Sequence, residues 1–130
     1  MAAVLAMALI LTGLGDRPPA KLNGIATWYD ATRNGTSSWY TRAGIKLYGA
    51  AGPALRKLIP VKWRMEPVAV LVRSARTGKQ AIVWIVDWCQ CYAGGGRERL
   101  IDLAPAVWNK LGIDLGRGVT EVTITVYDSR

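Results

Sequence analysis

Acidic side chains are the groups in this sequence whose type and spacing suit catalysis. Asp87 ends the apolar run QAIVWIVD, Asp102 lies between apolar neighbours in Leu-Ile-Asp-Leu, and Asp30 follows Thr-Trp-Tyr. Cleavage of a glycosidic bond needs a proton donor and usually a second carboxylate, and apolar surroundings raise a carboxyl pKa as a proton donor requires. We therefore predict Asp87 as the acid/base of such a reaction, with Asp102 and Asp30 as further catalytic candidates.

Each aspartate also has a purely structural interpretation. An aspartate that ends a strand, such as Asp87, often accepts hydrogen bonds from loop amides. Asp102 would be a satisfied, partly buried carboxylate that holds the fold together, and Asp30 would be an ordinary loop residue. The residues alone leave both interpretations open.

The chain has no histidine and two cysteines. This excludes a Ser-His-Asp triad, a Cys-His pair and a histidine-based zinc site. Two thiols alone do not complete a zinc site, so we predict neither a metal nor another cofactor. Cys89 and Cys91 are separated by one residue. A disulfide in an oxidising compartment and two free thiols are both compatible with that spacing.

Every aromatic ring of the chain belongs to Trp or Tyr, because the sequence has 6 Trp, 5 Tyr and no Phe. Such rings stack on the apolar faces of sugars while their polar edges bind hydroxyls. Rings in or beside expected loops are therefore candidates for substrate binding, with packing at the strand ends as the alternative. We predict as substrate-binding residues Trp28, Tyr29, Trp88, Tyr92 and, through bidentate contact with an acidic group, Arg97, with Arg99 beside it.

The net charge is +8, from 17 Lys and Arg against 9 Asp and Glu. Such a balance suits a polyanionic partner, which would be nucleic acid, an anionic membrane or an acidic cell-wall polymer. The basic residues are dispersed, and no run of five or six occurs. We therefore expect a solvated basic surface and no nucleic-acid partner.

Short strands are expected to position these residues. Alternating or β-branched apolar residues predict strands over 24–29, 68–73, 80–87 and 118–127. Loop-forming residues fill 30–44, one or two short helical turns fit 46–57, and a helix is expected over 105–111. The sequence therefore predicts a mainly β fold, a small barrel with one or two short helices.

Two tryptophans fall inside these elements. Trp84 lies in the strand over 80–87, which is nearly all apolar, and Trp108 lies in the expected helix. An apolar strand of this kind implies burial on both faces or a small closed barrel. We therefore expect both tryptophans in the core.

An apolar segment precedes the expected barrel. Residues 2–14 are uncharged and apolar, too short for a comfortable transmembrane helix but long enough for the core of an export signal. An atypical signal or anchor, packing on a partner protein, and a misassigned start codon are the alternatives. We expect residues 1–22 to form this segment and a Pro-rich linker, and residues 23–130 to form one domain.

The ordered motifs resemble a known family. Gly24-Ile-Ala-Thr-Trp-Tyr29, Val70-Leu-Val-Arg73, Thr77-Gly78-Lys, Val83 to Asp87 and Arg99-Leu-Ile-Asp102-Leu follow one another as in rare lipoprotein A-like domains, which are related to expansins and barwins. The resemblance covers about residues 23–128. It implies a six-stranded double-psi β-barrel that binds or cleaves peptidoglycan in the cell envelope or outside the cell.

The resemblance also bears on single residues. Asp87 matches an aspartate of the transglycosylases in this family, and Leu-Ile-Asp102-Leu resembles the Phe-Asp-Leu of expansins and family forty-five endoglucanases, where the Asp is the general acid. The transglycosylases carry a Glu and a His where this chain has Ile45 and Gly52. Catalysis is therefore left open, and the alternative is a non-catalytic structural module, for example a phage virion or tail component.

Overall fold

The computed structural model describes residues 18–33, 38–59 and 66–127. The apolar segment over residues 2–14, with its expected signal, anchor or partner-packing role, lies outside the described residues. Among the described helices, none has the length and apolar character needed to cross a membrane. The elements in chain order are β1 (Ala20–Trp28), α2 (Trp39–Arg42), β2 (Tyr48–Ala51), α3 (Pro53–Arg56), β3 (Val68–Ser74), β4 (Gln80–Trp88), β5 (Ile101–Leu103), α4 (Pro105–Lys110), the 3-10 helix η2 (Leu115–Arg117) and β6 (Thr120–Val126).

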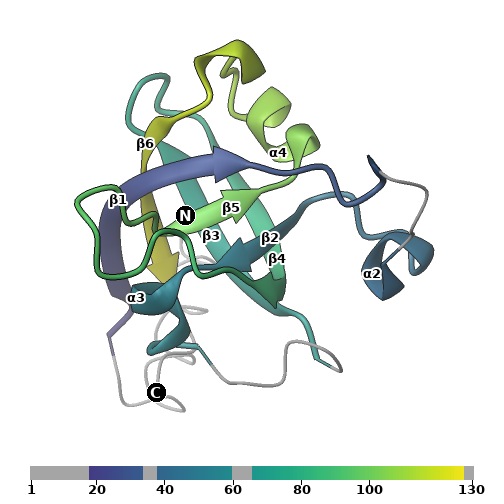
Figure 1. The fold of residues 1–130 in the computed structure, drawn as a ribbon, viewed down its shortest axis with the longest axis horizontal. Helices are drawn as coiled ribbons and strands as arrows, with labels where there is room; N and C mark the ends of the chain where they lie inside the picture. Colours follow the sequence, from purple (N-terminus) through teal and green to yellow (C-terminus); the bar gives the residue numbers. More distant parts are fainter. Residues whose placement is uncertain (1–17, 34–37, 60–65, 128–130) are drawn as a thin grey trace, which may run out of the picture.

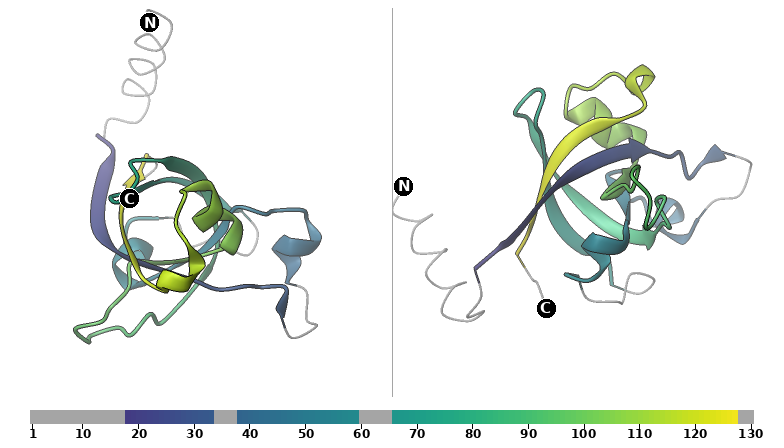
Figure 2. Two further views of the ribbon diagram at one scale, coloured as in Figure 1. Left: turned by 90° about the horizontal axis from the view of Figure 1, so that it is seen from above. Right: turned by 60° about the vertical axis from the view of Figure 1, so that its left-hand side comes forward.

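The six strands close into a barrel in the order β1-β5-β2-β4-β3-β6 (Figures 1 and 2). Closure is made by β1 and β6, which pair antiparallel from Ala20 opposite Val126 to Ala26 opposite Thr120. Two pairings, β1 with β5 and β2 with β4, are parallel. The mainly β, six-stranded barrel expected from the sequence is therefore confirmed.

The core lies inside the barrel and under α4. Alternation along β6 turns Val122 and Ile124 inward, where they are buried, while Glu121 stays exposed. Trp108 of α4 is fully buried, and its indole Nε1 donates a hydrogen bond to the Thr27 carbonyl at 3.1 Å. The expectation that Trp108 belongs to the core is confirmed, and the bond ties α4 to β1.

The outward face of β4 differs from the expectation for an apolar strand. Ile82 is 46% exposed and Trp84 is 42% exposed, while their neighbours Val83 and Ile85 are fully buried. Burial on both faces and a core position for Trp84 were therefore wrong, and the closed-barrel alternative was right. The reason is that a single-layer barrel buries one face of each strand, so apolar residues on the other face remain at the surface.

The segment after residue 30 holds more regular structure than expected. Helix α2 lies within the expected loop over 30–44, and residues 46–57 form strand β2 before the short helix α3. The described residues form three short α-helices, where one or two were expected. Strand β2 escapes detection because Tyr-Gly-Ala-Ala does not alternate. Its small residues suit a crowded position, since a Cβ on Gly49 would lie 3.2 Å from Cγ1 of Val83.

Candidate functional site

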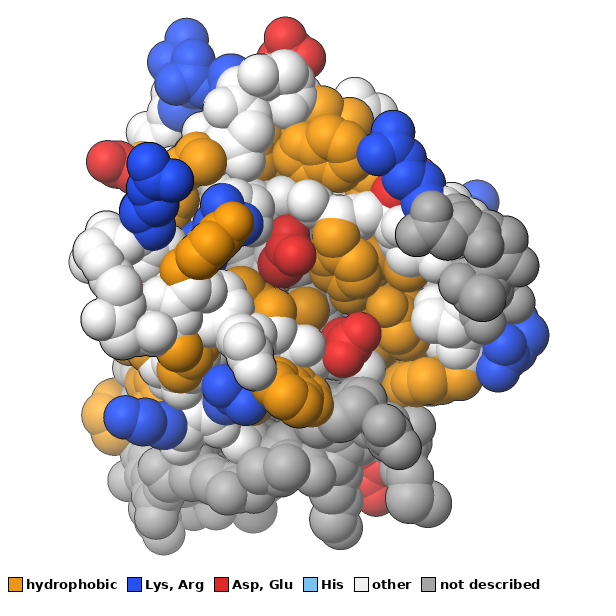
Figure 3. All heavy atoms as spheres, viewed as in Figure 1, with side chains coloured by type: hydrophobic (Ala, Val, Ile, Leu, Met, Phe, Trp, Pro, Cys, Tyr) orange, Lys and Arg blue, Asp and Glu red, His pale blue; other side chains and the backbone are white. Residues whose placement is uncertain are grey.

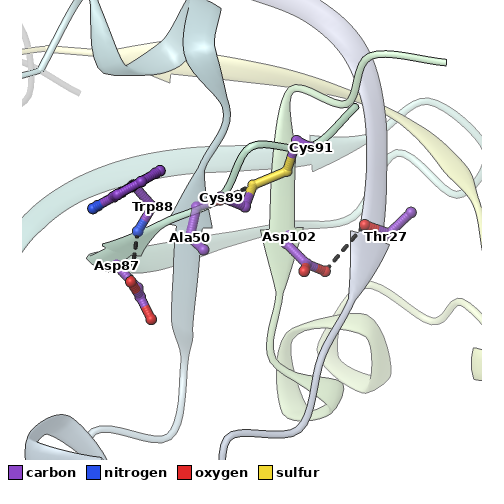
Figure 4. The surroundings of a disulfide bond; sticks show 7 residues. All are labelled: Thr27, Ala50, Asp87, Trp88, Cys89, Cys91 and Asp102. Atoms are coloured by element: carbon purple, nitrogen blue, oxygen red, sulfur yellow. Dashed lines mark hydrogen bonds between the residues drawn. A yellow bond between two sulfur atoms is a disulfide. The ribbon is translucent and has the colours of Figure 1, made fainter. Parts of the chain in front are cut away.

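Four strands place a row of residues side by side on the outside of the barrel. Ala50 of β2 pairs with Asp87 of β4 on one side and with Asp102 of β5 on the other. Asp102 in turn pairs with Thr27 of β1. Directly paired residues project from the same face of a sheet. Thr27, Asp102, Ala50 and Asp87 therefore form one row, called here the aspartate row, which Figure 4 shows.

A β-bulge brings Asp87 into the aspartate row. Gly49 pairs with Ile85, but the next residue, Ala50, pairs with Asp87, so Val86 is the extra residue on β4. Ile85 and Val86 are both fully buried. A bulge shifts the alternation of a strand by one residue and redirects the side chains that follow. Without this shift Val86 would lie opposite Ala50.

Asp102 is half-buried and accepts a hydrogen bond from a neighbouring strand. Thr27 Oγ1 donates a hydrogen bond to Asp102 Oδ1 at 3.0 Å (Figure 4). Burial raises the pKa of Asp102, and the bond from Thr27 and the charge of Arg99 oppose that rise in part. A carboxyl with a raised pKa holds its proton to higher pH, which is the property of a proton donor.

Asp87 lies beside a cluster of tyrosines. The Trp88 backbone N–H donates to Asp87 Oδ1 at 2.8 Å, and the Tyr40 hydroxyl donates to Oδ2 at 3.4 Å. Tyr29 and Tyr40 hydroxyls lie 3.3 Å apart, and both rings contact Tyr48, with centroids at 5.3 and 5.1 Å. Burial is the largest cause that raises the pKa of each of these tyrosines. The three hydroxyls are therefore neutral, and that of Tyr40 contacts the carboxylate directly.

Asp30 lies in a turn beyond β1, outside the aspartate row. Its Oδ1 accepts hydrogen bonds from the Thr32 backbone N–H at 2.9 Å and from the Thr32 hydroxyl. These bonds lower the pKa of Asp30, so it remains ionised. The geometry matches the loop interpretation of this residue and gives it no carboxylate partner in the row.

An open groove of about 550 Å³ runs from the row toward the loop after β4. Its lining includes Asp102 and the Cys89–Cys91 pair. The structure records a disulfide between these cysteines, which answers the question that their spacing left open. The Cys89 N–H donates to the Ala51 carbonyl at 3.0 Å, and the Arg99 N–H donates to the Cys91 carbonyl at 2.8 Å. These backbone hydrogen bonds join the loop that carries the disulfide to β2 and to the chain just before β5.

One exposed ring lines this groove, and a second contacts an arginine of its lining. Trp88 is 42% exposed and Tyr92, which lines the groove, is 58% exposed. The guanidinium Cζ of Arg56 lies 4.7 Å from the Trp88 ring centroid, and that of Arg99 lies 4.4 Å from the Tyr92 centroid. Figure 3 shows acidic side chains among hydrophobic ones on the face over β5, β2 and β4, with basic side chains around them. This face of the molecule therefore exposes aromatic rings of about the size of a sugar ring next to charged side chains.

The other predicted binding residues are placed differently. Trp28 is half-buried and donates from Nε1 to the Leu115 carbonyl at 3.0 Å, which anchors η2. Tyr29 belongs to the tyrosine cluster beside Asp87. Arg97 is exposed in the loop, and the groove is lined by Arg99 in its place. Four residues of the site were not predicted from the sequence. The positions of Thr27 and Tyr48 depend on strand pairing, and those of Tyr40 and Arg56 depend on where α2 and α3 lie beside the barrel, which no local pattern reveals.

The two departures from the transglycosylase pattern are built into the packing. A Cβ on Gly52 would lie 2.2 Å from the Arg99 carbonyl oxygen and 2.9 Å from that of Leu100, so no histidine fits there. Ile45 packs its side chain against the core. Within the described ranges, no group of three or more Cys, Asp or Glu gathers as metal ligands would.

Comparisons with known proteins give distant likenesses. No protein-family model matches the chain. Over 54 residues, 42% of the chain, the sequence is 32% identical to "Putative ripening-related protein 6" of Oryza sativa subsp. japonica, and this stretch spans 32% of that protein. The fold is similar to that of the Streptomyces papain inhibitor, with a TM-score of 0.54 and 24% identity over 82% of this chain and 94% of that one. The structural likeness concerns the fold alone.

Proposed function

We propose that this protein is a rare lipoprotein A-like double-psi barrel that binds peptidoglycan or another cell-wall glycan along the aspartate row and its groove. The observation that carries the proposal is the joining of Asp102 and Asp87 in one outward row, next to the exposed rings of Trp88 and Tyr92. The parallel pairings β1–β5 and β2–β4 support the barrel class. The proposal places the protein at the cell envelope or outside the cell.

The chemistry of the groove suits sugars. Carboxylates accept hydrogen bonds from sugar hydroxyls, and exposed indole and phenol rings supply flat apolar surfaces for sugar rings. The groove of about 550 Å³ is open and polar enough to admit a chain that continues at both ends. A site of this kind binds by several weak contacts spread over successive sugars.

Cleavage of the glycan is a second candidate function, favoured by the raised pKa of Asp102. In this scheme Asp102 protonates the leaving glycosidic oxygen, and Asp87 is the second carboxylate. Two strand spacings separate their Cα atoms by ~10 Å along the sheet. Inverting enzymes hold their two carboxyl groups about 6.5–9.5 Å apart to admit a water molecule, and side chains that project from the same face at this Cα spacing are compatible with that range. Asp87 as the acid, predicted from the sequence, would reverse these roles.

Binding is tested by sedimentation of the protein with purified peptidoglycan sacculi. We expect Tyr92→Ala and Trp88→Ala each to weaken binding about tenfold, because each removes a stacking surface. Tyr127→Ala is the matched control, since Tyr127 is 57% exposed and Tyr92 is 58% exposed. Equal binding by all three variants and the unchanged protein would refute glycan binding in this groove.

Cleavage is tested by the release of soluble glycan fragments from the same sacculi. If the protein is active, the Asp102→Asn and Asp87→Asn variants should no longer release glycan fragments. Both variants should still sediment with sacculi. Absence of fragments from the unchanged protein would exclude the catalytic form and leave the binding proposal standing. In that case the protein would be a non-catalytic module that contacts the wall, either at the cell envelope or as a virion component.

A further inference from the structure

We infer that the groove contains an anion subsite, formed by Arg56 and Arg99, for a carboxylate or phosphate group carried by the glycan. The inference rests on the proposed glycan-binding function and adds the chemical class of ligand. Both residues line the groove, Arg56 from α3 and Arg99 from the chain just before β5. Neither arginine belongs to the aspartate row, so the anion subsite is a separate part of the groove.

The Arg56 side chain supplies an unused donor. Its Nε atom is buried and has no hydrogen-bond partner among the described residues. A buried donor without a partner carries a desolvation cost that folding alone does not recover. Because Nε has almost no accessible surface, a ligand in the groove would meet the terminal N–H groups of the guanidinium instead. The guanidinium is held against the Trp88 ring, with its Cζ 4.7 Å from the centroid, so it is ordered before the ligand arrives.

Arg99 is held in an equivalent way. Its Cζ lies 4.4 Å from the Tyr92 ring centroid, and its backbone N–H donates to the Cys91 carbonyl at 2.8 Å. Cys91 and Tyr92 have φ angles of 48° and 55°, in the left-handed region that non-glycine residues seldom adopt. The loop therefore keeps an unfavourable backbone conformation that presents Tyr92 and Arg99 to the groove.

A stacked guanidinium keeps the in-plane N–H donors at its edge free for bidentate contact with a carboxylate or phosphate. Two such groups at one groove are typical of sites that select an acidic ligand. Asp102 lines the same groove and would repel an acidic group placed next to it. The arrangement therefore fits a ligand whose acidic substituent meets the arginines while an uncharged sugar ring lies over Asp102.

The test compares four probes by calorimetry at low salt: an oligosaccharide of N-acetylglucosamine, a peptidoglycan disaccharide with a free lactyl carboxylate, the methyl ester of that disaccharide, and a glycerol phosphate oligomer. The disaccharide should bind about tenfold tighter than its methyl ester. Arg56→Gln and Arg99→Gln should each remove most of that preference. Arg117→Gln is the control, because Arg117 lines a separate groove with Ile25 and Glu121. The thermal midpoint of each variant shows whether it is folded.

The outcomes distinguish the anion subsite from the glycan-binding function on which it rests. Preference for the carboxylated disaccharide assigns the subsite to glycan carboxylates, and preference for the glycerol phosphate oligomer assigns it to a phosphate-bearing wall polymer. Equal, arginine-independent binding of neutral and acidic probes would overturn the anion subsite and keep glycan binding. Binding of none of the probes, together with failure to sediment with sacculi, would overturn both.

Discussion

Asp102 and Asp30 are two aspartates whose environments move their pKa values in opposite directions. Burial raises the pKa of Asp102, whereas hydrogen bonds from Thr32 lower that of Asp30. A raised carboxyl pKa means that the folded protein holds the proton more tightly than the unfolded chain, in which the pKa is about 3.9. The stabilisation from Asp102 is therefore complete below that pH and is lost as the pH rises through the folded-state pKa.

This predicts opposite pH dependences for two matched variants. Relative to Asp102→Asn, the unchanged protein should lose stability as the pH rises from 3 to 7, because only its Asp102 becomes charged. Relative to Asp30→Asn, it should gain stability over the same change, since ionised Asp30 is stabilised by Thr32. Urea unfolding at several pH values measures both differences. The same sign for the two variants would contradict the assignment.

Position 52 requires glycine, because the surrounding backbone leaves no space for a side chain. We expect Gly52→Ala to destabilise the protein by about 3 kcal/mol or more, because its Cβ would lie 2.2 Å from the Arg99 carbonyl and neither backbone segment can withdraw without breaking a strand pairing. Gly96→Ala is the control, as nothing lies within 4 Å of a Cβ at that position. Equal unfolding midpoints in urea for the two variants would show that the β2 end is looser than described.

At the level of elements, the longer strands β1, β3, β4 and β6 were predictable from the sequence and the short strands β2 and β5 were not. The alternation of GVTEVTITVY predicted β6, and Pro105 and Gly112 bounded the helix that became α4. Strand β2 has no alternation, and its identity comes from pairing on both sides, with Asp87 of β4 and Asp102 of β5. Sequence reasoning selected both aspartates but could not place them in one row, because the bulge and the position of β2 are products of tertiary pairing.

Helix α4 is expected to contribute strongly to stability through one residue. Trp108→Ala should destabilise the protein by about 3–5 kcal/mol, since it empties a fully buried site and leaves the Thr27 carbonyl without its donor. Trp84→Ala, at a 42% exposed position on β4, should cost less than about 1 kcal/mol. Chemical unfolding of both variants measures the difference. A larger loss for Trp84→Ala would mean that the outer face of β4 is covered in solution.

The disulfide loop should affect the groove more than the barrel. Cys89 and Cys91 are separated by 2 positions, and closure of so short a loop restricts the unfolded chain by only ~1.6 kcal/mol. We expect the double variant Cys89→Ser, Cys91→Ser to retain the barrel, with a free energy of unfolding lower by less than about 2 kcal/mol. Its affinity for sacculi should fall several-fold, because Tyr92 and Arg99 lose their fixed positions. Unchanged affinity in the folded variant would show that the disulfide does not hold the groove.

At the level of the whole molecule, the net charge of +8 and the aspartate row with its groove would contribute in different ways to the proposed binding of a glycan. Dispersed basic residues give a general attraction to acidic polymers, which salt screens over about 8–10 Å. The aspartate row and the groove instead place individual charged side chains beside aromatic rings. Contacts of a ligand with these groups would depend on its shape as well as on its charge. Composition alone could indicate an acidic partner, but it could not distinguish Arg99, which lines the groove, from Arg97, which does not.

Closure of the barrel through β1 and β6 also has a consequence for engineering. Because Ala20 lies opposite Val126, the described chain begins and finishes on adjacent strands, ~5 Å apart at their Cα atoms. A short Gly-Ser linker could therefore join residues 20 and 127, and new termini could be cut between Gly95 and Gly96 in the exposed loop. Such a circular permutant should fold to the same barrel, and it would place any fused tag or reporter at the mouth of the groove.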